Sequence, residues 1–344
     1  MTAMAARVTL AVLAARLGVS VSTVSNAYNR PDQLSEALRE RILATARELG
    51  YAGPDPRASS LRRGRVGAIG LIEKSLPAAL TDPASLLMLG GVAEACDEAG
   101  VALVLIPRRA DGQSAHDIVR TAVVDGFVAH CDALDDERRS IVEERGLPIV
   151  VLDGRRGHAR DPLVSIDEEA GARAAADHLL DLGHRRFGIV RFQPLTPGGI
   201  NTVAERRLAG YREALRARGV PDADVAQIDG FAYDRAEMRR RAGELLGRPD
   251  RPTGILAMSD EMAVGVIAAA TDHGLRVPED LSVVGFDDTS TAHNSTPPLT
   301  TVHQPHADKG AAAVRMLLGA GEGPQEISFP VRLVVRRSTA PPPA

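Results

Sequence analysis

The sequence has no tryptophan and only two cysteines, Cys96 and Cys131. Two cysteines this far apart form neither a disulfide framework nor a clustered zinc site, which fits a reducing cytoplasm. No run of about 18 apolar residues is present, which excludes a typical membrane span. The first ten residues, MTAMAARVTL, lack the apolar core of a signal peptide. We therefore expect a cytoplasmic protein.

The chain also lacks the common signatures of cofactor and ester chemistry. It contains no G-x-G-x-x-G, no P-loop and no G-x-S-x-G. His303 and His306 stand close together in TTVHQPH, but beside a proline and away from any acidic or cysteine partner in the sequence. A structural role fits these histidines better than a metal site. We expect no catalytic residues, no cofactor and no metal.

Positive charge is concentrated at the N-terminus. Residues 1–65 hold ten arginines and five acidic residues, a net charge of +5, whereas the whole chain has a net charge of -4. A basic head on an acidic body is consistent with binding nucleic acid at one end only.

Residues 8–29, VTLAVLAARLGVSVSTVSNAYN, have the pattern of two short helices joined by a tight turn. Thr9 can cap the first helix, Gly18 ends it, and Ser20 can cap the second. The outward face of the second helix carries short side chains: Val21, Ser22, Ser25 and Asn26. Small hydrogen-bonding groups at the start of a second helix are typical of a helix-turn-helix that enters the DNA major groove. An ordinary helical hairpin is the alternative that the spacing alone leaves open.

Residues 8–51, which add a third helix from Ser35 to Gly50, closely resemble the DNA-binding headpiece of the lactose-repressor/galactose-repressor family of bacterial transcription regulators. The resemblance implies that Val21, Ser22 and Asn26 read bases. It also implies further DNA contacts, from Thr9, Ser20, Thr23, Ser25 and Asn29. Many relatives have arginine in place of Asn26. Arginine favours guanine and asparagine pairs best with adenine, so we expect an altered half-site preference.

Residues 53–65, GPDPRASSLRRGR, have the composition of a linker, and their centre is long enough for about two helical turns. A flexible tether is one interpretation. The resemblance instead implies a hinge helix that folds only on DNA, with Ala58 and Leu61 at the minor groove and Leu61 as a wedge between base pairs.

From residue 66 onward, β-branched runs alternate with amphipathic helical stretches, which predicts parallel sheets covered by helices. The expected strands are VGAIGLI, VALVLIP, DGFVAH, PIVVLD, RFGIVRF, VAQID, TGILAMS and LSVVGFDD. Helices are expected at residues 86–99, 168–182 and 203–218. About ten strands are too many for one compact Rossmann unit. The expected fold is therefore an all-α helix-turn-helix headpiece followed by an α/β body of two Rossmann-like subdomains.

Four segments carry the family resemblance through this body: DHLLDLGHRRFGIV, RRLAGYREAL, SDEMAVGVIAAATDHGLRVPEDLSVVGFDD and PPLTTVHQP. The resemblance implies a periplasmic-binding-protein-like body with an effector in the cleft between its subdomains. We expect a headpiece at 1–52, a hinge at 53–65 and the body at 66–344, with a first subdomain of about 66–164 and 290–322 and a second of about 165–289 and 323–340. The chain should cross between them near 164–167, near 288–291 and before a strand at 327–336.

Arg207, in RRLAGY, and Asp287, at the end of VVGFD, match the arginine and the carboxylate that face the cleft in this family. Such a pair can hold adjacent hydroxyls or ring nitrogens of a polar ligand, although a structural salt bridge is the alternative. Further cleft candidates are Asp82, Asp153, Asn201, Phe231 and Ser259. Phe231 could stack on a ring face. Sugar-binding relatives often use tryptophan there. Because this chain has no tryptophan, the sequence does not decide between a sugar and a nucleoside-like effector.

We therefore expect a nucleoid-associated transcription regulator, most simply a repressor, that acts as a homodimer on pseudo-palindromic operator DNA, is controlled by a small polar effector and is not an enzyme. The segment RRSTAPPPA has three prolines and no heptads, which excludes a tetramer through a C-terminal coiled coil. A solute-binding protein would need a signal peptide and no headpiece. A sugar-modifying α/β enzyme would need a nucleophile or an acid/base pair in the cleft.

Overall fold

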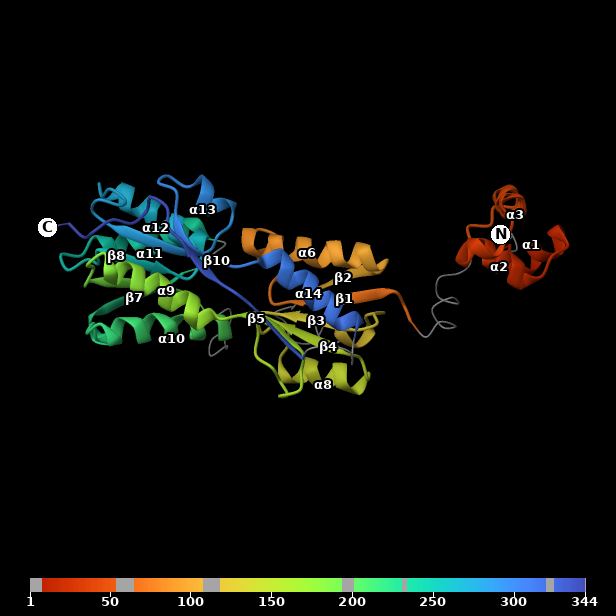
Figure 1. Cartoon of the computed structure of the whole chain (residues 1–344), viewed down its shortest axis with the longest axis horizontal. Helices are drawn as coiled ribbons and strands as arrows, with labels where there is room; N and C mark the ends of the chain where they lie inside the picture. Colours follow the sequence, from red (N-terminus) through yellow and green to blue (C-terminus); the bar gives the residue numbers. More distant parts are fainter. Residues whose placement is uncertain are drawn as a thin grey trace, which may run out of the picture. The chain divides into compact units, whose positions relative to one another are not determined.

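The structure, a computed structural model, describes residues 8–53, 65–107, 118–193, 201–230, 234–319 and 325–343. Contacts divide the chain into two compact units, Met1–Gly67 and Ala68–Ala344, which we call the headpiece and the body (Figure 1). The expected hinge contacts Ala58 and Leu61, and the cleft candidate Phe231, lie outside the described residues.

The headpiece consists of α1 (Leu10–Leu17), α2 (Val21–Asn29), the short 3-10 turn η1 (Pro31–Gln33) and α3 (Glu36–Glu48). The hydroxyl of Thr9 caps α1 by accepting from Val12 N, at 3.4 Å, and that of Ser20 caps α2 by accepting from Thr23 N, at 3.0 Å. Gly18 ends α1 in the left-handed region, with φ 68°. The buried core is small and apolar: Leu13, Ala14, Val24, Ala27, Ile42 and Ala46.

Within the described residues no single helix is long and apolar enough to span a membrane. The pair α1 and α2 passes the same test by length and composition, but is bent by 110°. That bend is the crossing expected of a helix-turn-helix.

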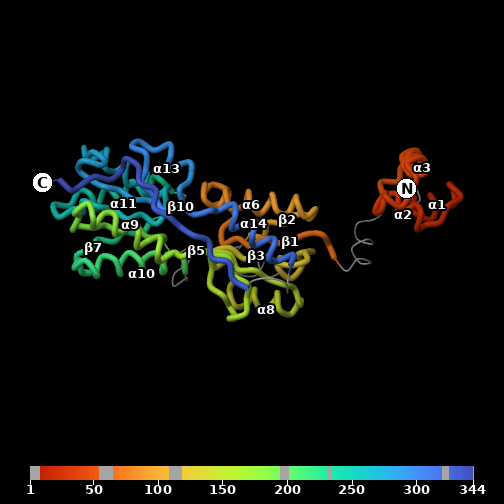
Figure 2. Tube along the Cα trace, in the orientation of Figure 1, coloured from red at the N-terminus to blue at the C-terminus, as the bar shows by residue number. Residues whose placement is uncertain are grey.

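The described part of the body contains two sheets of six strands each, which lie one after the other along the body (Figures 1 and 2). The first has the order β11-β5-β4-β3-β1-β2, and all its pairs are parallel. Its strands are β1 (Ala68–Glu73), β2 (Ala102–Pro107), β3 (Phe127–His130), β4 (Ile149–Leu152), β5 (Leu163–Ile166) and β11 (Glu326–Phe329). The second has the order β12-β10-β9-β8-β6-β7 and is parallel except for β12. Its strands are β6 (Phe187–Phe192), β7 (Val225–Gly230), β8 (Gly254–Ala257), β9 (Ser282–Asp287), β10 (Thr300–His303) and β12 (Arg332–Val334).

Helices cover both sheets. Those of the first subdomain are α5 (Leu76–Ala79), α6 (Pro83–Ala99), α8 (Asp136–Glu144) and α14 (His306–Leu318). Those of the second are α9 (Glu168–Asp181), α10 (Thr202–Ala217), η2 (Asp222–Asp224), α11 (Arg235–Leu246), α12 (Asp260–Asp272) and α13 (Ser290–Asn294). Helices α6 and α14 lie side by side (Figure 1), and a Cβ added at Gly91 would lie 1.9 Å from the carbonyl oxygen of Ala307. Glycine is therefore required for this close approach.

The eight expected strand segments are strands, but two expected crossings between subdomains are wrong. The first crossing follows β5, within the expected 164–167. The second lies after β10 and not at 288–291, because β10 pairs with β9 in the second sheet. Residues 290–303 therefore belong to the second subdomain. The third crossing lies between β11 and β12 and not before residue 327. The expected strand 327–336 is two strands, since β11 joins the first sheet and β12 the second. Pro330, which has no N–H to donate, lies between them.

Candidate functional site

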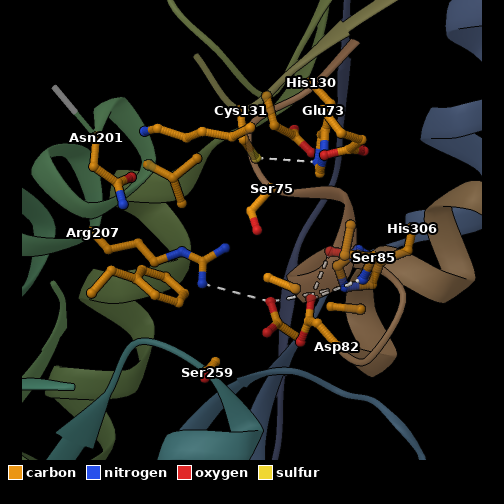
Figure 3. A pocket seen from close by; sticks show the side chains of 18 of the residues that line it. Glu73, Ser75, Asp82, Ser85, His130, Cys131, Asn201, Arg207, Ser259 and His306 are labelled. Atoms are coloured by element: carbon orange, nitrogen blue, oxygen red, sulfur yellow. Dashed lines mark hydrogen bonds and ion pairs between the residues drawn. The ribbon is translucent and has the colours of Figure 1, made fainter. Parts of the chain in front are cut away.

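A cleft of about 200 Å³ lies between the two subdomains (Figure 3). One wall comes from the ends of β1, β3 and β4 and the start of α6. The other comes from the ends of β6 and β9 and the starts of α10 and α12. Carboxyl ends of parallel strands commonly form such sites, because the loops that follow them meet at one edge of the sheet. Six of the seven expected cleft residues line it: Asp82, Asp153, Asn201, Arg207, Ser259 and Asp287. Their contact with an effector remains a prediction.

Arg207 is held firmly in the second wall, and only 3% of its surface is exposed. Its Nε donates to Glu168 Oε2 at 2.7 Å, and its Nη1 donates to the carbonyl oxygen of Met258 at 2.5 Å. The guanidinium lies 3.6 Å from the ring centroid of Phe286 and 3.6 Å from Asp287 Oδ1. Burial alone would lower the pKa of Arg207, but the carboxylates of Glu168 and Asp287 outweigh it and raise that pKa. Arg207 is thus both a structural ion-pair partner and a lining residue of the cleft.

A chain of hydrogen bonds joins Asp287 to Asp153 across the cleft floor. Gln304 Nε2 donates to Asp287 Oδ1 at 2.6 Å, and Lys309 Nζ donates to Gln304 Oε1 at 2.6 Å and to Asp153 Oδ2. Both aspartates have positive φ, 112° for Asp287 and 53° for Asp153. Burial, more than any other cause, holds the pKa of Asp287 well above its usual range. The positive φ values indicate backbone strain held in place by this network.

Three buried polar atoms of the cleft have no hydrogen-bond partner among the described residues: Asp153 Oδ1, His306 Nε2 and Gln193 Oε1. His306 Nε2 lies 3.8 Å from Asp287 Oδ1. Burial, together with the charges of Lys309 and Arg207, lowers the pKa of His306 to about 2, so its imidazole is neutral. Because native proteins seldom leave buried polar atoms unpaired, these atoms are available to a ligand.

Three of the expected cleft residues also cap helices. Asp82 Oδ2 accepts from Ser85 N at 3.0 Å, Asn201 Oδ1 accepts from Ala204 N at 3.0 Å, and Ser259 Oγ accepts from Met262 N at 3.3 Å. The caps fix these side chains at the cleft wall, with Asp82 and Asn201 on opposite subdomains (Figure 3).

Glu73, His130 and Cys131 are among the lining residues that were not expected from the sequence. His130 Nδ1 lies 3.0 Å from Glu73 Oε1, and its Nε2 lies 3.1 Å from Cys131 Sγ. Glu73 ends β1 and His130 ends β3, and these strands are parallel neighbours. The positions of the two residues at strand ends were the signal that could have found them.

Asp132 joins the two subdomains beside the cleft. Its Oδ2 accepts from Thr202 N at 2.7 Å, and its Oδ1 accepts from Thr202 Oγ1 at 3.0 Å. Thr202 is the first residue of α10, so the carboxylate also meets the positive end of that helix. The helix that carries Arg207 is thereby attached to the opposite wall.

The outward face of α2 in the headpiece is exposed and polar. Val21 is 46% exposed, and Asn26 donates from Nδ2 to Gln33 Oε1 at 3.3 Å. Ser20 Oγ lies 2.7 Å from both Ser22 Oγ and Thr23 Oγ1. Val21, Ser22, Thr23 and Asn26 thus lie in the first two turns of α2, where a recognition helix carries its base-reading residues.

Comparisons with known proteins give a match for the headpiece and a match for the body. Residues 9–53 match the family of bacterial regulatory proteins of the lacI type, and residues 176–339 match the periplasmic binding protein-like domain. The chain is 38% identical to an HTH-type transcriptional regulator of Mycobacterium tuberculosis, over 98% of each chain. It is 33% identical to the ribose operon repressor of Escherichia coli, over 88% of this chain and 89% of that one.

Among solved structures, the Lac repressor dimer bound to operator and an anti-inducer has a TM-score of 0.80 and 28% identity, and the match covers 97% of this chain and 100% of that one. The body therefore has the Lac repressor fold, and the headpiece has the helix-turn-helix of DNA-binding regulators. The chain belongs to the lacI family of bacterial regulatory proteins and is a DNA-binding transcriptional regulator.

Proposed function

We propose that this regulator is a cytoplasmic repressor that binds a pseudo-palindromic operator as a homodimer and is controlled by a small polar effector in the cleft. The observation that carries the effector site is a set of buried atoms, Asp153 Oδ1 and His306 Nε2 among them, that have no hydrogen-bond partner within the described residues and line a cleft between two subdomains. In this proposal the effector is bound and released without turnover, since the relatives described above are regulators.

The hydrogen-bonding groups of the cleft favour a neutral effector rich in hydroxyls. The guanidinium of Arg207 is already paired with Glu168 and Asp287, and the ammonium of Lys309 with Asp153. A phosphate would have to displace one of these buried carboxylates, whereas a hydroxyl can donate to Asp153 Oδ1 without breaking a pair. The name of the ribose operon repressor supports a sugar over a nucleoside.

An exposed apolar surface supports the homodimer. Leu86 and Leu87 on α6 are 44% and 45% exposed, and Leu80, just before this helix, is 46% exposed. Neighbouring exposed leucines on one element are typical of a protein interface. The related Lac repressor was solved as a dimer on its operator, and a palindromic site requires two headpieces.

The contact between Asp132 and Thr202 supports coupling of the cleft to the subdomain arrangement. An effector that binds the closed cleft more tightly than the open one favours the closed arrangement of the subdomains. The difference between its two affinities sets how far the equilibrium between closed and open can shift. Because α10 carries both Thr202 and Arg207, ligand contacts and the cross-cleft contact act on the same helix.

The proposal is tested by fluorescence anisotropy of the full chain on DNA from upstream of its own operon, with and without ribose and a panel of other neutral sugars, nucleosides and phosphorylated sugars. We expect tight, salt-dependent binding to a subset of fragments and a change in affinity with a neutral sugar. Specific binding that no compound of the panel changes would contradict the effector assignment. Absence of any preferred fragment would contradict the operator assignment.

The second test concerns base reading by α2. Asn26→Arg should move the preferred base at one position of each half-site from adenine toward guanine, since asparagine is bidentate to adenine and arginine to guanine. Each wrong base should cost about 1–3 kcal/mol. Selection from a randomised DNA library measures this preference. Arg315→Ala, an exposed position on α14 in the body, is the control that should leave it unchanged.

A further inference from the structure

The cleft contains a thiol that recognition of hydroxyl groups does not need. Cys131 Sγ lies 3.1 Å from His130 Nε2, and His130 Nδ1 lies 3.0 Å and 3.2 Å from the two carboxylate oxygens of Glu73. A thiol, an imidazole and a carboxylate connected in this order form the arrangement that activates cysteine nucleophiles. His130 and Glu73 are buried, with 8% and 5% of their surfaces exposed, whereas Cys131 is partly exposed at the cleft.

The thiol of Cys131 and the imidazole of His130 influence each other's pKa, so one proton can be held by either group. Burial raises the pKa of the Cys131 thiol, and the neighbouring His130 works against that rise. Burial would lower the pKa of His130, but a thiolate on Cys131 and the carboxylate of Glu73 raise it well above its usual value. Once sulfur gives up its proton, His130 therefore holds it.

The backbone keeps the thiol at the cleft. Cys131 has φ 47°, in the left-handed region, and its N–H donates to the carbonyl oxygen of Leu152 at 2.9 Å. That bond places Cys131 beside Asp153, whose Oδ1 is buried and has no partner. The other cysteine, Cys96, is 3% exposed within α6 and packs in an apolar cluster.

We propose that Cys131 is a covalent binding site for small polar aldehydes that enter the cleft. Its sulfur forms a bond to the carbonyl carbon, the carbon–oxygen π bond breaks, and the thiol proton passes through His130 to the oxygen. The product is a neutral hemithioacetal, formed reversibly without a leaving group, oxidant or reductant. Asp153 Oδ1 supplies an acceptor for a hydroxyl of the bound molecule. The inference uses the cleft of the proposed function but requires neither DNA nor a particular effector.

The experiment follows alkylation of Cys131 and Cys96 in the same sample of reduced full chain, with iodoacetamide and peptide mass spectrometry. We expect Cys131 to react at least about tenfold faster than Cys96, because Cys131 is partly exposed and has the imidazole of His130 within hydrogen-bond distance, whereas Cys96 is buried in an apolar cluster. Glycolaldehyde should slow alkylation of Cys131 and not of Cys96. Ethylene glycol, which replaces the aldehyde by an alcohol, should slow neither.

Two variants separate activation from mere exposure. His130→Gln should lower the alkylation rate of Cys131 at least about tenfold, whereas His158→Gln should not, because His158 is exposed and pairs with Glu143 at the surface. Carbonyl-labelled glycolaldehyde should give a protein-bound carbon resonance by NMR that Cys131→Ser abolishes. Equal protection by glycolaldehyde and ethylene glycol, or no such resonance with the wild-type chain, would overturn the proposal. Neither result would affect the test with sugars and operator DNA.

Discussion

Replacement of Arg207 by alanine should destabilise the body strongly as well as alter the cleft. The substitution removes a residue of which 3% is exposed and leaves Glu168 and Asp287, 4% and 6% exposed, without their cation. Breaking one side of a buried ion pair costs about 3–5 kcal/mol, because the remaining charge stays desolvated. The stacking of Arg207 on Phe286, at 3.6 Å, is lost as well. We expect a loss of about 3–5 kcal/mol in the free energy of unfolding of the body.

Urea unfolding followed by far-UV circular dichroism measures this loss, since the chain has no tryptophan to report by fluorescence. Arg315→Ala is the matched control: its ion pair with Glu98 is 62% and 57% exposed, so its removal should cost under about 1 kcal/mol. If Arg207→Ala were as stable as Arg315→Ala, the ion-pair role described here would be refuted. Operator binding should persist below the unfolding transition, because the headpiece has its own core.

Three further predictions concern other parts of the chain. Ser20→Ala should destabilise the headpiece by about 1 kcal/mol, because it removes the cap of α2; faster amide hydrogen exchange in α2 would show this, and unchanged exchange would contradict it. Leu87→Glu should weaken the homodimer and give monomers at micromolar concentration by light scattering; a dimer as tight as wild type would place the interface elsewhere. Burial raises the pKa of Asp260 to about 7. The folded state then binds more protons than the unfolded state between about pH 4 and pH 7, so stability should fall as pH rises through this window. Asp260→Asn should flatten that dependence in urea unfolding, and an unchanged slope would assign it to other groups.

The elements with the strongest apolar patterns could be predicted from the sequence, including short strands such as β3, β4 and β8, whereas the sheet to which a short polar strand belongs could not. Runs such as 68–72 are buried on both faces, so no polar residue interrupts them. Strand β10, TTVH, has only four residues, two of them threonine. The sheet to which β10 belongs is decided by the strands beside it in the folded protein, and the local sequence pattern does not identify those strands. For this reason the second crossing was assigned to the wrong side of β10.

The cleft was predictable where a residue lies in a familiar motif, as Arg207 and Asp287 do. It was not predictable where function depends on pairing between distant strands. Glu73 and His130 are 57 residues apart and meet only because β1 and β3 are neighbours in register, with Ile72 opposite Ala129. A structural salt bridge of Arg207 was the alternative to a cleft role, but the sequence does not show that its closest carboxylate partner is Glu168.

The late position of β11 and β12 in the chain has a consequence for synthesis on the ribosome. Each strand forms an edge of a different sheet, and both lie within residues 326–334. A nascent chain that ends before these strands lacks one edge strand in each subdomain, so neither sheet is complete. This holds even when most of the first subdomain has already left the exit tunnel. The headpiece needs nothing beyond residue 53 for its core. Because domains fold as units from the N-terminus, a DNA-binding head is formed while the part that regulates it is still incomplete.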